Sequence, residues 1–326
     1  MMLSKTFRIA AGIVISLLFV IAAFYKIRLG DFLVALLGTN LINLLLCLFF
    51  FCTSCLFRAG IWHITTRPLK HVSISTLFGG IMVGYMANNF LPLRAGELVR
   101  AHYLSARTDI PYPAAFCTVC IERVFDVLSL ALLLTAGLIW GIRGLAVDKA
   151  VLAFTALWIL VVTAVFITVA CRRLNRPAEK SPAFMLWVRY RIKEFLGPVT
   201  NLKQPKKLFS LTLLSLAAWA VNYLALLVLI SGAVRNSTEA ALLLLLFINI
   251  GLLIPSSPGA LGIIQVAFWT ALAPFGVTKE TAIALSIAFQ VGLYVFTLAM
   301  GLPYYLRATL SFSLMPEYSH KETGQS

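Results

Sequence analysis

Three charged side chains lie well inside one apolar run of this chain. The segment IERVFDVLSL places Glu122, Arg123 and Asp126 within the run 112–140. If this run crosses a bilayer, each charge near its centre costs about 2.5–3.5 kcal/mol. The three groups must therefore pair or be hydrated, and helical spacing lets Arg123 reach Asp126 at i+3. They either line a polar site or form a structural ion-pair network that stabilises the fold.

A second polar motif, NNFLPLRAGELVRAHYL (88–104), follows an apolar run that begins near residue 73. Its proline and glycine predict a break between two helical pieces. Its arginines are candidate partners for the carboxylates of the first motif, and a charge cluster that anchors a helix end is the alternative. The candidate side chains are Asn88, Asn89, Arg94, Glu97 and Arg100.

A third segment, IPSSPGALGIIQ (254–265), interrupts the apolar run 240–273 without any charge. Prolines remove backbone donors and glycines allow close approach, so backbone groups freed at this break could line a site. A helix that begins near Gly259 would direct its N-terminal N–H groups inward, which suits an anion such as phosphate. A simple kink in a packed helix is the alternative. The candidate residues are Asn249, Ser256, Ser257, Gly259 and Gln265.

The elements that must position these motifs are membrane-spanning helices. Of the 326 residues, 60% are hydrophobic and 12% are charged, whereas roughly a quarter are charged in soluble domains. The apolar runs are continuous rather than alternating, which predicts an all-α polytopic membrane protein. We treat 1–326 as one integral membrane domain. Six runs are long enough for full spans: 8–25, 32–57, 112–140, 150–171, 208–232 and 281–306.

The basic residues predict the orientation. The net charge is +15, and ten of the 27 Lys and Arg residues lie in the loop 172–207. The positive-inside rule places this loop and both termini in the cytoplasm. Residues 73–111 and 240–273 must then each enter and leave the membrane on one side, as broken re-entrant hairpins. The resulting halves, 8–171 and 208–306 with a tail at 307–326, have the inverted-repeat-like arrangement of many transporters.

Several other functions are disfavoured. No nucleic-acid recognition motif accompanies the basic charge, so we expect no nucleic-acid partner. Two C-x-x-C pairs, at 52–55 and 117–120, lie in or beside apolar runs, where cysteine behaves as a small apolar residue. We therefore expect no metal and no cofactor. No nucleotide-binding motif is present, so transport would be driven by a gradient or by downhill flow.

In this order, NNFLPLRAGELVRAHYL, ERVFDVL and IPSSPGALGIIQ resemble the lysylphosphatidylglycerol synthase transmembrane family, also called the flippase-like domain family. The resemblance covers roughly 8–310 and implies the membrane half of a bifunctional enzyme without its soluble synthase domain. It implies lipid translocation rather than lipid synthesis. The family commonly has a glutamate where this chain has Gln265, which argues against a cationic, aminoacylated lipid as the substrate.

We therefore expect a flippase or scramblase of the bacterial inner membrane, and not an enzyme. Its partner would be an anionic phospholipid or a lipid-linked sugar, and an oligomer is compatible with this reading. In this hypothesis Arg94 and Arg100 meet the headgroup phosphate near the cytoplasmic face, and the charges of ERVFD line the midplane. Two alternatives stay open: a membrane-embedded enzyme acting on a lipid-linked group, and a regulatory partner of an envelope-lipid enzyme.

Overall fold

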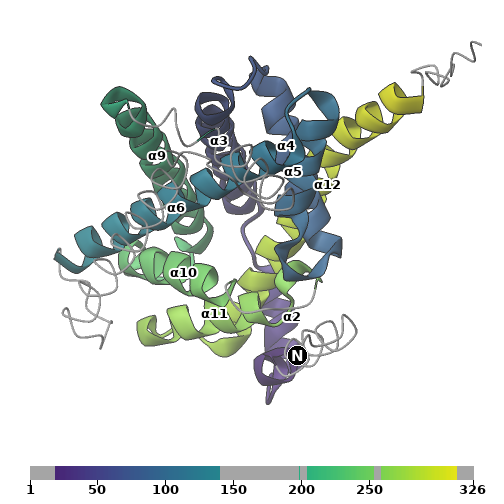
Figure 1. Ribbon diagram of the computed structural model, residues 1–326. Coiled ribbons are helices and arrows are strands. Elements are labelled where there is room, and N and C mark those ends of the chain that lie inside the picture. Colours follow the sequence, from purple (N-terminus) through teal and green to yellow (C-terminus); the bar gives the residue numbers. More distant parts are fainter. Residues whose placement is uncertain (1–18, 140–197, 199–203, 253–257, 314–326) are drawn as a thin grey trace, which may run out of the picture.

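The computed structural model describes residues 19–139, 198, 204–252 and 258–313, and all regular structure within them is helical (Figure 1). The main helices pack in neighbouring pairs, chiefly α3 on α9, α12 on α4, α4 on α5 and α10 on α11. The elements are α2 (Leu29–Leu37), α3 (Leu41–Thr66), α4 (Ile74–Phe90), η1 (Pro92–Arg94), α5 (Gly96–Arg107), α6 (Tyr112–Ile139), α9 (Pro205–Ile230), α10 (Ser237–Gly251), η3 (Pro258–Ala260), α11 (Ile263–Leu272), η4 (Ala273–Phe275) and α12 (Lys279–Ser313).

Four helices in the described part are long and apolar enough to cross a bilayer: Leu41–Thr66, Pro205–Ile230, Pro258–Phe275 and Lys279–Thr309. This confirms a helical, multi-pass membrane protein. α6 has 28 residues but carries the three charges of ERVFD within its apolar run. The predicted span 150–171 lies outside the described residues, as do most of the span 8–25, most of the loop 172–207 and the tail beyond residue 313.

The predicted single span 32–57 is wrong. The chain forms two helices there, because Asn40 begins a new one: its side chain accepts hydrogen bonds from the N–H groups of Ile42 and Asn43. α3 then continues past residue 57 to Thr66. It includes Arg58, which directly follows the predicted end of the span. The predicted span 281–306 is likewise longer, as α12 reaches Ser313.

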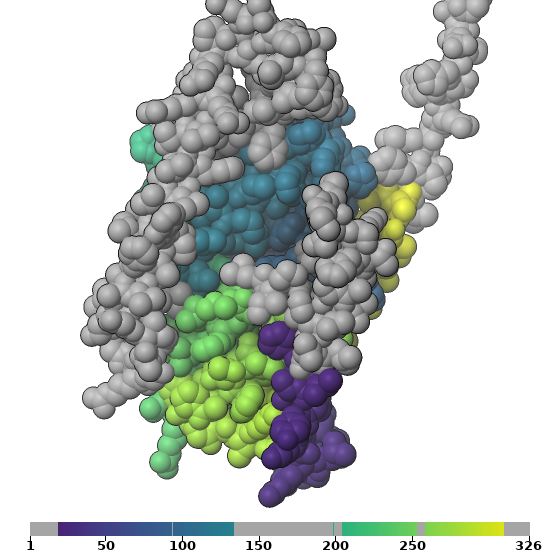
Figure 2. Space-filling view, turned by 60° about the horizontal axis from the view of Figure 1, so that its bottom comes forward, coloured from purple at the N-terminus to yellow at the C-terminus, as the bar shows by residue number. Residues whose placement is uncertain are grey.

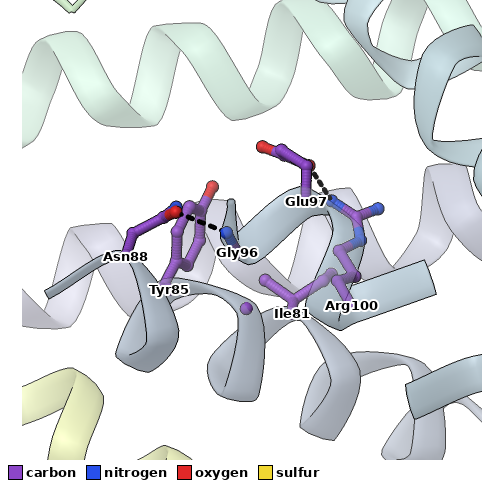
Figure 3. Close-up of a pocket in the computed structure, with 7 residues that line it drawn as sticks. Ile81, Tyr85, Asn88, Gly96, Glu97 and Arg100 are labelled. Atoms are coloured by element: carbon purple, nitrogen blue, oxygen red, sulfur yellow. Dashed lines mark hydrogen bonds and ion pairs between the residues drawn. The ribbon is translucent and has the colours of Figure 1, made fainter. Parts of the chain in front are cut away.

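The break in the first hairpin lies where the sequence predicted it. α4 ends at Phe90, the chain makes one short turn in η1, and α5 begins at Gly96. The side chain of Asn88 accepts a hydrogen bond of 2.8 Å from the N–H of Gly96, which ties the two helices across the break (Figure 3). A Cβ on Gly96 would lie 2.0 Å from the carbonyl oxygen of Gly84, so only glycine permits this approach.

The two ends of this hairpin meet. Lys70, just before α4, forms an ion pair with Asp109, just after α5. The hydrogen bond from Lys70 lowers the pKa of the Asp109 carboxyl below its ordinary value. The start of α4, near Ile74, and the end of α5, near Arg107, therefore lie close to each other.

The second hairpin repeats this design. α10 packs on α11, and the connection between them contains Gly259 and Gly262 in the left-handed region, with φ of 70° and 84°. The helix after the break begins at Ile263 rather than near Gly259 as predicted, since both glycines adopt non-helical angles. η3 contacts both η1 and α4, so the two breaks adjoin each other. Figure 2 shows α10 and α11, in green to yellow-green, directly below the teal surface of α5 and α6.

Candidate functional site: a buried ion-pair network beside the first break

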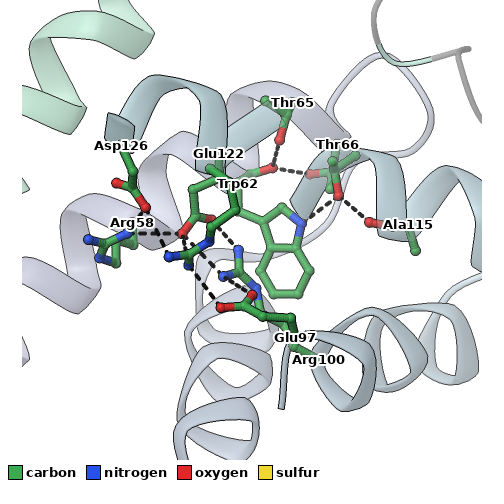
Figure 4. A network of polar contacts seen from close by, with 11 residues as sticks. Arg58, Trp62, Thr65, Thr66, Glu97, Arg100, Ala115, Glu122 and Asp126 are labelled. Carbon is green, nitrogen blue, oxygen red and sulfur yellow. Dashed lines mark hydrogen bonds and ion pairs between the residues drawn. The ribbon is translucent and has the colours of Figure 1, made fainter. Parts of the chain in front are cut away.

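Six charged side chains from three helices form one network (Figure 4). It contains three guanidinium groups and three carboxylates, so its formal charge is zero. α3 supplies one member, α5 two and α6 three. A neutral, mutually paired set is the arrangement in which buried charges are tolerated in a low-dielectric interior. The members are Arg58, Glu97, Arg100, Glu122, Arg123 and Asp126.

Glu122 is the centre of the network and is fully buried. Its Oε1 accepts hydrogen bonds of 3.2 Å from the guanidinium groups of Arg58, Arg100 and Arg123. Its second oxygen pairs closely with Arg100 Nη2. The predicted pairing between the two motifs is therefore confirmed for Arg100.

Asp126 extends the network to a fourth helix. Its Oδ2 lies 2.6 Å from Arg58 Nη1 and 3.1 Å from Arg123 Nη1, which confirms the i, i+3 pairing predicted from spacing. Its Oδ1 accepts a 3.1 Å hydrogen bond from the indole N–H of Trp219 on α9. Each buried oxygen of this carboxylate thus has a donor.

Two tryptophans cover the buried arginines. The guanidinium carbon of Arg100 lies 4.1 Å from the centre of the Trp62 ring, and that of Arg58 lies 5.5 Å from the Trp219 ring. Trp62 is itself fixed by a 2.7 Å hydrogen bond to Thr118. Cation–π contacts of this kind strengthen when desolvated. Arg58 and Arg100 each contact carboxylates of the network and the ring of one tryptophan.

One edge of the network is open. The side chain of Arg123 is 33% exposed and that of Glu97 is 20% exposed, and the two form an ion pair of 3.2 Å at this edge. Three buried atoms here have no hydrogen-bond partner within the described residues: Glu97 Oε2, Arg100 Nε and Arg123 Nε. Buried polar atoms usually find a partner, so these three atoms are candidates for contact with water or with a polar ligand.

The open edge adjoins a narrow crevice at the first break, which has no room for a water-sized sphere (Figure 3). Tyr85, Asn88, Glu97 and Arg100 line it. Arg94 precedes this crevice on η1, half-buried and with a φ of 55°. Within the described part of the chain Arg94 has no ion pair, and its strained backbone is the kind that often marks a binding site.

The other predicted residues of the first hairpin have structural contacts. Asn88 caps the break as described above. Asn89 donates a 2.9 Å hydrogen bond to the hydroxyl of Thr297 on α12. Neither prolines nor the spacing of the motif pointed to α12 as the partner of this asparagine.

Hydrogen bonds from two side-chain amides and a tyrosine hydroxyl fix the backbone of the second break. Gln265 accepts a 2.7 Å hydrogen bond from the N–H of Gly262 and donates one of 2.6 Å to Gln290. Gln290 and Tyr294 both donate to the carbonyl oxygen of Gly259, at 2.6 and 2.7 Å. The capped N–H of Gly262 is therefore engaged within the protein rather than directed at an anion.

The two breaks differ in the kind of polar side chain that lies at each. Asn249 donates within its own helix to the carbonyl oxygen of Leu245, at 2.7 Å. Ser256 and Ser257 lie outside the described residues. The charges are thus gathered at the first break, and the second break contributes neutral groups that fix its own backbone.

Sequence reasoning missed several residues of these networks: Arg58, Trp62, Trp219, Gln290, Tyr294 and Thr297. A signal for Arg58 was available, because the apolar segment AGIWHI follows it directly and extends the helix around the charge. The tryptophans and Gln290 carry no local signal, since their partners lie on helices distant in the sequence.

Residues 9–301 match the family described as Lysylphosphatidylglycerol synthase TM region. The chain belongs to this family. The match covers both breaks and all six members of the ion-pair network, so the site described here lies within the family's own region. It also confirms the resemblance carried by the three sequence motifs.

Two curated proteins are similar to parts of the chain. Glycosyltransferase AglD of Haloferax volcanii is 27% identical over 250 residues, which is 65% of this chain and 40% of that protein. UPF0104 membrane protein MJ1595 of Methanocaldococcus jannaschii is 30% identical over 117 residues, 35% of each. The matched region therefore covers less than half of the length of either relative.

Proposed function

We propose that this family member translocates an anionic lipid, with the first break as its headgroup site. The observation that carries the proposal is the open edge of the ion-pair network, where Arg123 is 33% exposed and pairs with Glu97, which lines the crevice at the break. The nearby Arg94 has no ion pair within the described residues. A headgroup charge faces a large desolvation penalty in hydrocarbon. A polar edge inside a membrane domain lowers that penalty while the lipid chains stay in the bilayer.

The structure favours a different pair of phosphate ligands from the pair that the sequence suggested. Arg100 is 3% exposed and is occupied by Glu122 and Trp62. Its release would leave a fully buried carboxylate without its closest partner, which is strongly unfavourable. Arg94 has no ion pair within the described residues, and Arg123 is the most exposed arginine of the network although it pairs with three carboxylates, so we assign the phosphate to Arg94 with Arg123 beside it.

The two broken hairpins provide the path in this proposal. Non-helical backbone at membrane depth is tolerated only where it is buried in protein or lines a water-filled cavity. The ion pair between Lys70 and Asp109 supports a first hairpin that enters and leaves on one side of the membrane. The contact between η1 and η3 supports a second hairpin that meets it from the other side. We place the protein in a cytoplasmic membrane with both termini in the cytoplasm.

A second candidate is an enzyme acting on a lipid-linked sugar, because one relative is named a glycosyltransferase. Its carboxylates would have to transfer protons. Glu122 and Asp126 are each bound to at least two guanidinium groups, which stabilise the charged form and make a poor general base. Glu97, at the open edge, also pairs with Arg100 and Arg123, so each of the three network carboxylates has at least two guanidinium partners. We therefore prefer translocation and regard the chain as a transporter rather than an enzyme.

The test is lipid exchange in proteoliposomes that contain tail-labelled fluorescent lipids. Phosphatidylglycerol and phosphatidylcholine are compared by chemical reduction of the outer-leaflet dye, with and without a pH gradient. Arg94→Gln is expected to slow phosphatidylglycerol exchange about tenfold or more, since a hydrogen bond to a charged group contributes about 1.5–3 kcal/mol. Arg107→Gln is the matched control, because Arg107 is exposed on the last turn of α5.

Equal exchange rates in Arg94→Gln and the unaltered protein would contradict the assignment of the phosphate. Product formation from a lipid-linked sugar by the purified protein, without any exchange, would favour the enzyme instead. The unaltered protein and empty liposomes define the two limits of the assay.

A further inference from the structure

The helical residues 19–24 pack on the second hairpin and on α12. Ala23 is fully buried in one apolar cluster with side chains of α12. A Cβ on Gly262 would lie 2.6 Å from the backbone nitrogen of Val20, so only a glycine lets the two segments approach this closely. Figure 2 shows the purple start of the described chain against the yellow-green surface of α11. Segment 19–28 therefore covers one face of the second break.

Lys279, the first residue of α12, fixes the end of this helix. Its Nζ donates to the carbonyl oxygens of Ala22 and Tyr25, both at 2.9 Å, and lies 4.5 Å from the centre of the Trp269 ring on α11. The last carbonyl groups of a helix lack partners within the helix, and a cation beside them is favourable. The same charge is unfavourable at the start of α12. The contact with segment 19–28 therefore accounts for a lysine at this position.

A second contact joins the same two elements. The backbone N–H of Arg28 donates a hydrogen bond of 3.4 Å to Glu280 Oε1. Lys26 adopts a φ of 57°, in the left-handed region, at the turn between the first helical residues and α2. Both charged residues at the start of α12 thus bind segment 19–28, one as a donor and the other as an acceptor.

These contacts lie far from the base of the first hairpin. α3 and α12 run in the same direction, since Leu44 lies against Gly292 and Phe51 packs on Phe296. The chain passes from the end of α3 into the first hairpin, whereas segment 19–28 is bound at the start of α12. Segment 19–28 and the base of the first hairpin are therefore at opposite ends of these two helices.

We propose that segment 19–28 is a movable lid over the second break, and that Lys279 holds it shut. On its other side the break is already bonded to side chains of α11 and α12, as described above. Because Val20 lies directly against Gly262, the backbone of the break cannot change its conformation until the lid moves. The inference goes beyond the proposed function, and rests on it only for any effect of the lid on lipid movement.

The test is hydrogen exchange of the full-length protein in phosphatidylcholine nanodiscs, followed by mass spectrometry of the peptides at the second break. Lys279→Met removes both hydrogen bonds to the lid. It should raise the exchange rate at 259–266 about tenfold or more, because a hydrogen bond to a charged group contributes at least this factor. Ala23→Leu should have the same effect, since a larger side chain does not fit a fully buried site.

Two control variants separate the lid from general effects. Lys26→Met makes the same change at an exposed residue beside the contact and should leave the exchange rates unchanged. Lys279→Arg keeps a cation with several N–H donors and should retain most of the protection. Peptides of α3 and α9 report the stability of the whole protein, and we expect their exchange rates to be the same in every variant.

Unchanged exchange at 259–266 in both Lys279→Met and Ala23→Leu would overturn the inference. An equal rise throughout α3 and α9 would also overturn it, because the variants would then only destabilise the fold. The readout involves no lipid transport. A protein that exchanges no lipid in the proteoliposome assay, but shows the faster hydrogen exchange, would therefore contradict the proposed function and support the lid.

Discussion

Replacement of Glu122 by glutamine tests whether the ion-pair network supports the fold. Glu122 is fully buried and accepts hydrogen bonds from three guanidinium groups. Its neutralisation changes the formal charge of the network from zero to +1 and leaves the buried Arg58 and Arg100 with one carboxylate partner fewer. Removal of one partner from a buried ion pair destabilises a protein by about 3–5 kcal/mol. We expect a loss of this size in Glu122→Gln.

A charge-balanced double variant separates the pair interaction from other effects of the substitution. Arg100→Gln removes the closest partner of Glu122, and the double variant has a neutral network again. We expect the double variant to lose less stability than the sum of the single variants, because contacting residues of one network are coupled by about 0.5–3 kcal/mol. Asp109→Asn, which removes an exposed carboxylate, is the control.

The assay is the free energy of unfolding in mixed micelles, measured by titration with SDS and followed by tryptophan fluorescence. If Glu122→Gln unfolds at the same SDS fraction as the unaltered protein, the network is not a stabilising unit. Strict additivity of the two single variants would refute the claim that Arg100 and Glu122 act as a pair.

Three further substitutions test the breaks by the same titration. Gly96→Ala should destabilise the protein by about 1–3 kcal/mol or more, because its Cβ would lie 2.0 Å from a backbone oxygen. The control Gly30→Ala, with no atom within 4 Å of the new Cβ, should be neutral or slightly stabilising. Equal losses of stability in the two variants would contradict the steric argument. Gln265→Leu strips a buried N–H of its acceptor and should cost about 1–3 kcal/mol; an unchanged midpoint would show that this contact is dispensable. Thr297→Val removes the bond to Asn89 and should cost about 0.5–1.5 kcal/mol, with faster hydrogen exchange at 91–96, and unaltered exchange would disprove the link between α12 and the break.

Local features of the sequence predicted the breaks well. Pro92 has no N–H to donate, and Gly96 permits a close helix contact, so their effects do not depend on distant residues. The need for the ERVFD charges to pair followed equally from the desolvation penalty alone. Both conclusions rest on free-energy costs of several kcal/mol, and packing against other helices does not remove these costs.

The partners of these groups could not be predicted. Arg58 is 64 residues from Glu122, and Trp219 is 93 residues from Asp126. No periodicity in one helix shows which other helix will lie against it. The split between α2 and α3 was not predicted, because apolar residues on both sides of Asn40 form a nearly continuous hydrophobic run.

The contacts of α12 have a mechanical consequence. Gln290 and Tyr294 hold the carbonyl group of Gly259 at the second break, and Thr297 holds Asn89 beside the first. At 1.5 Å per residue these contacts lie within roughly 10 Å along one helix. A helix is stiff over two turns, so a shift of α12 that releases one break also displaces the other. The conformations of the two breaks would then be coupled through α12 rather than independent of each other.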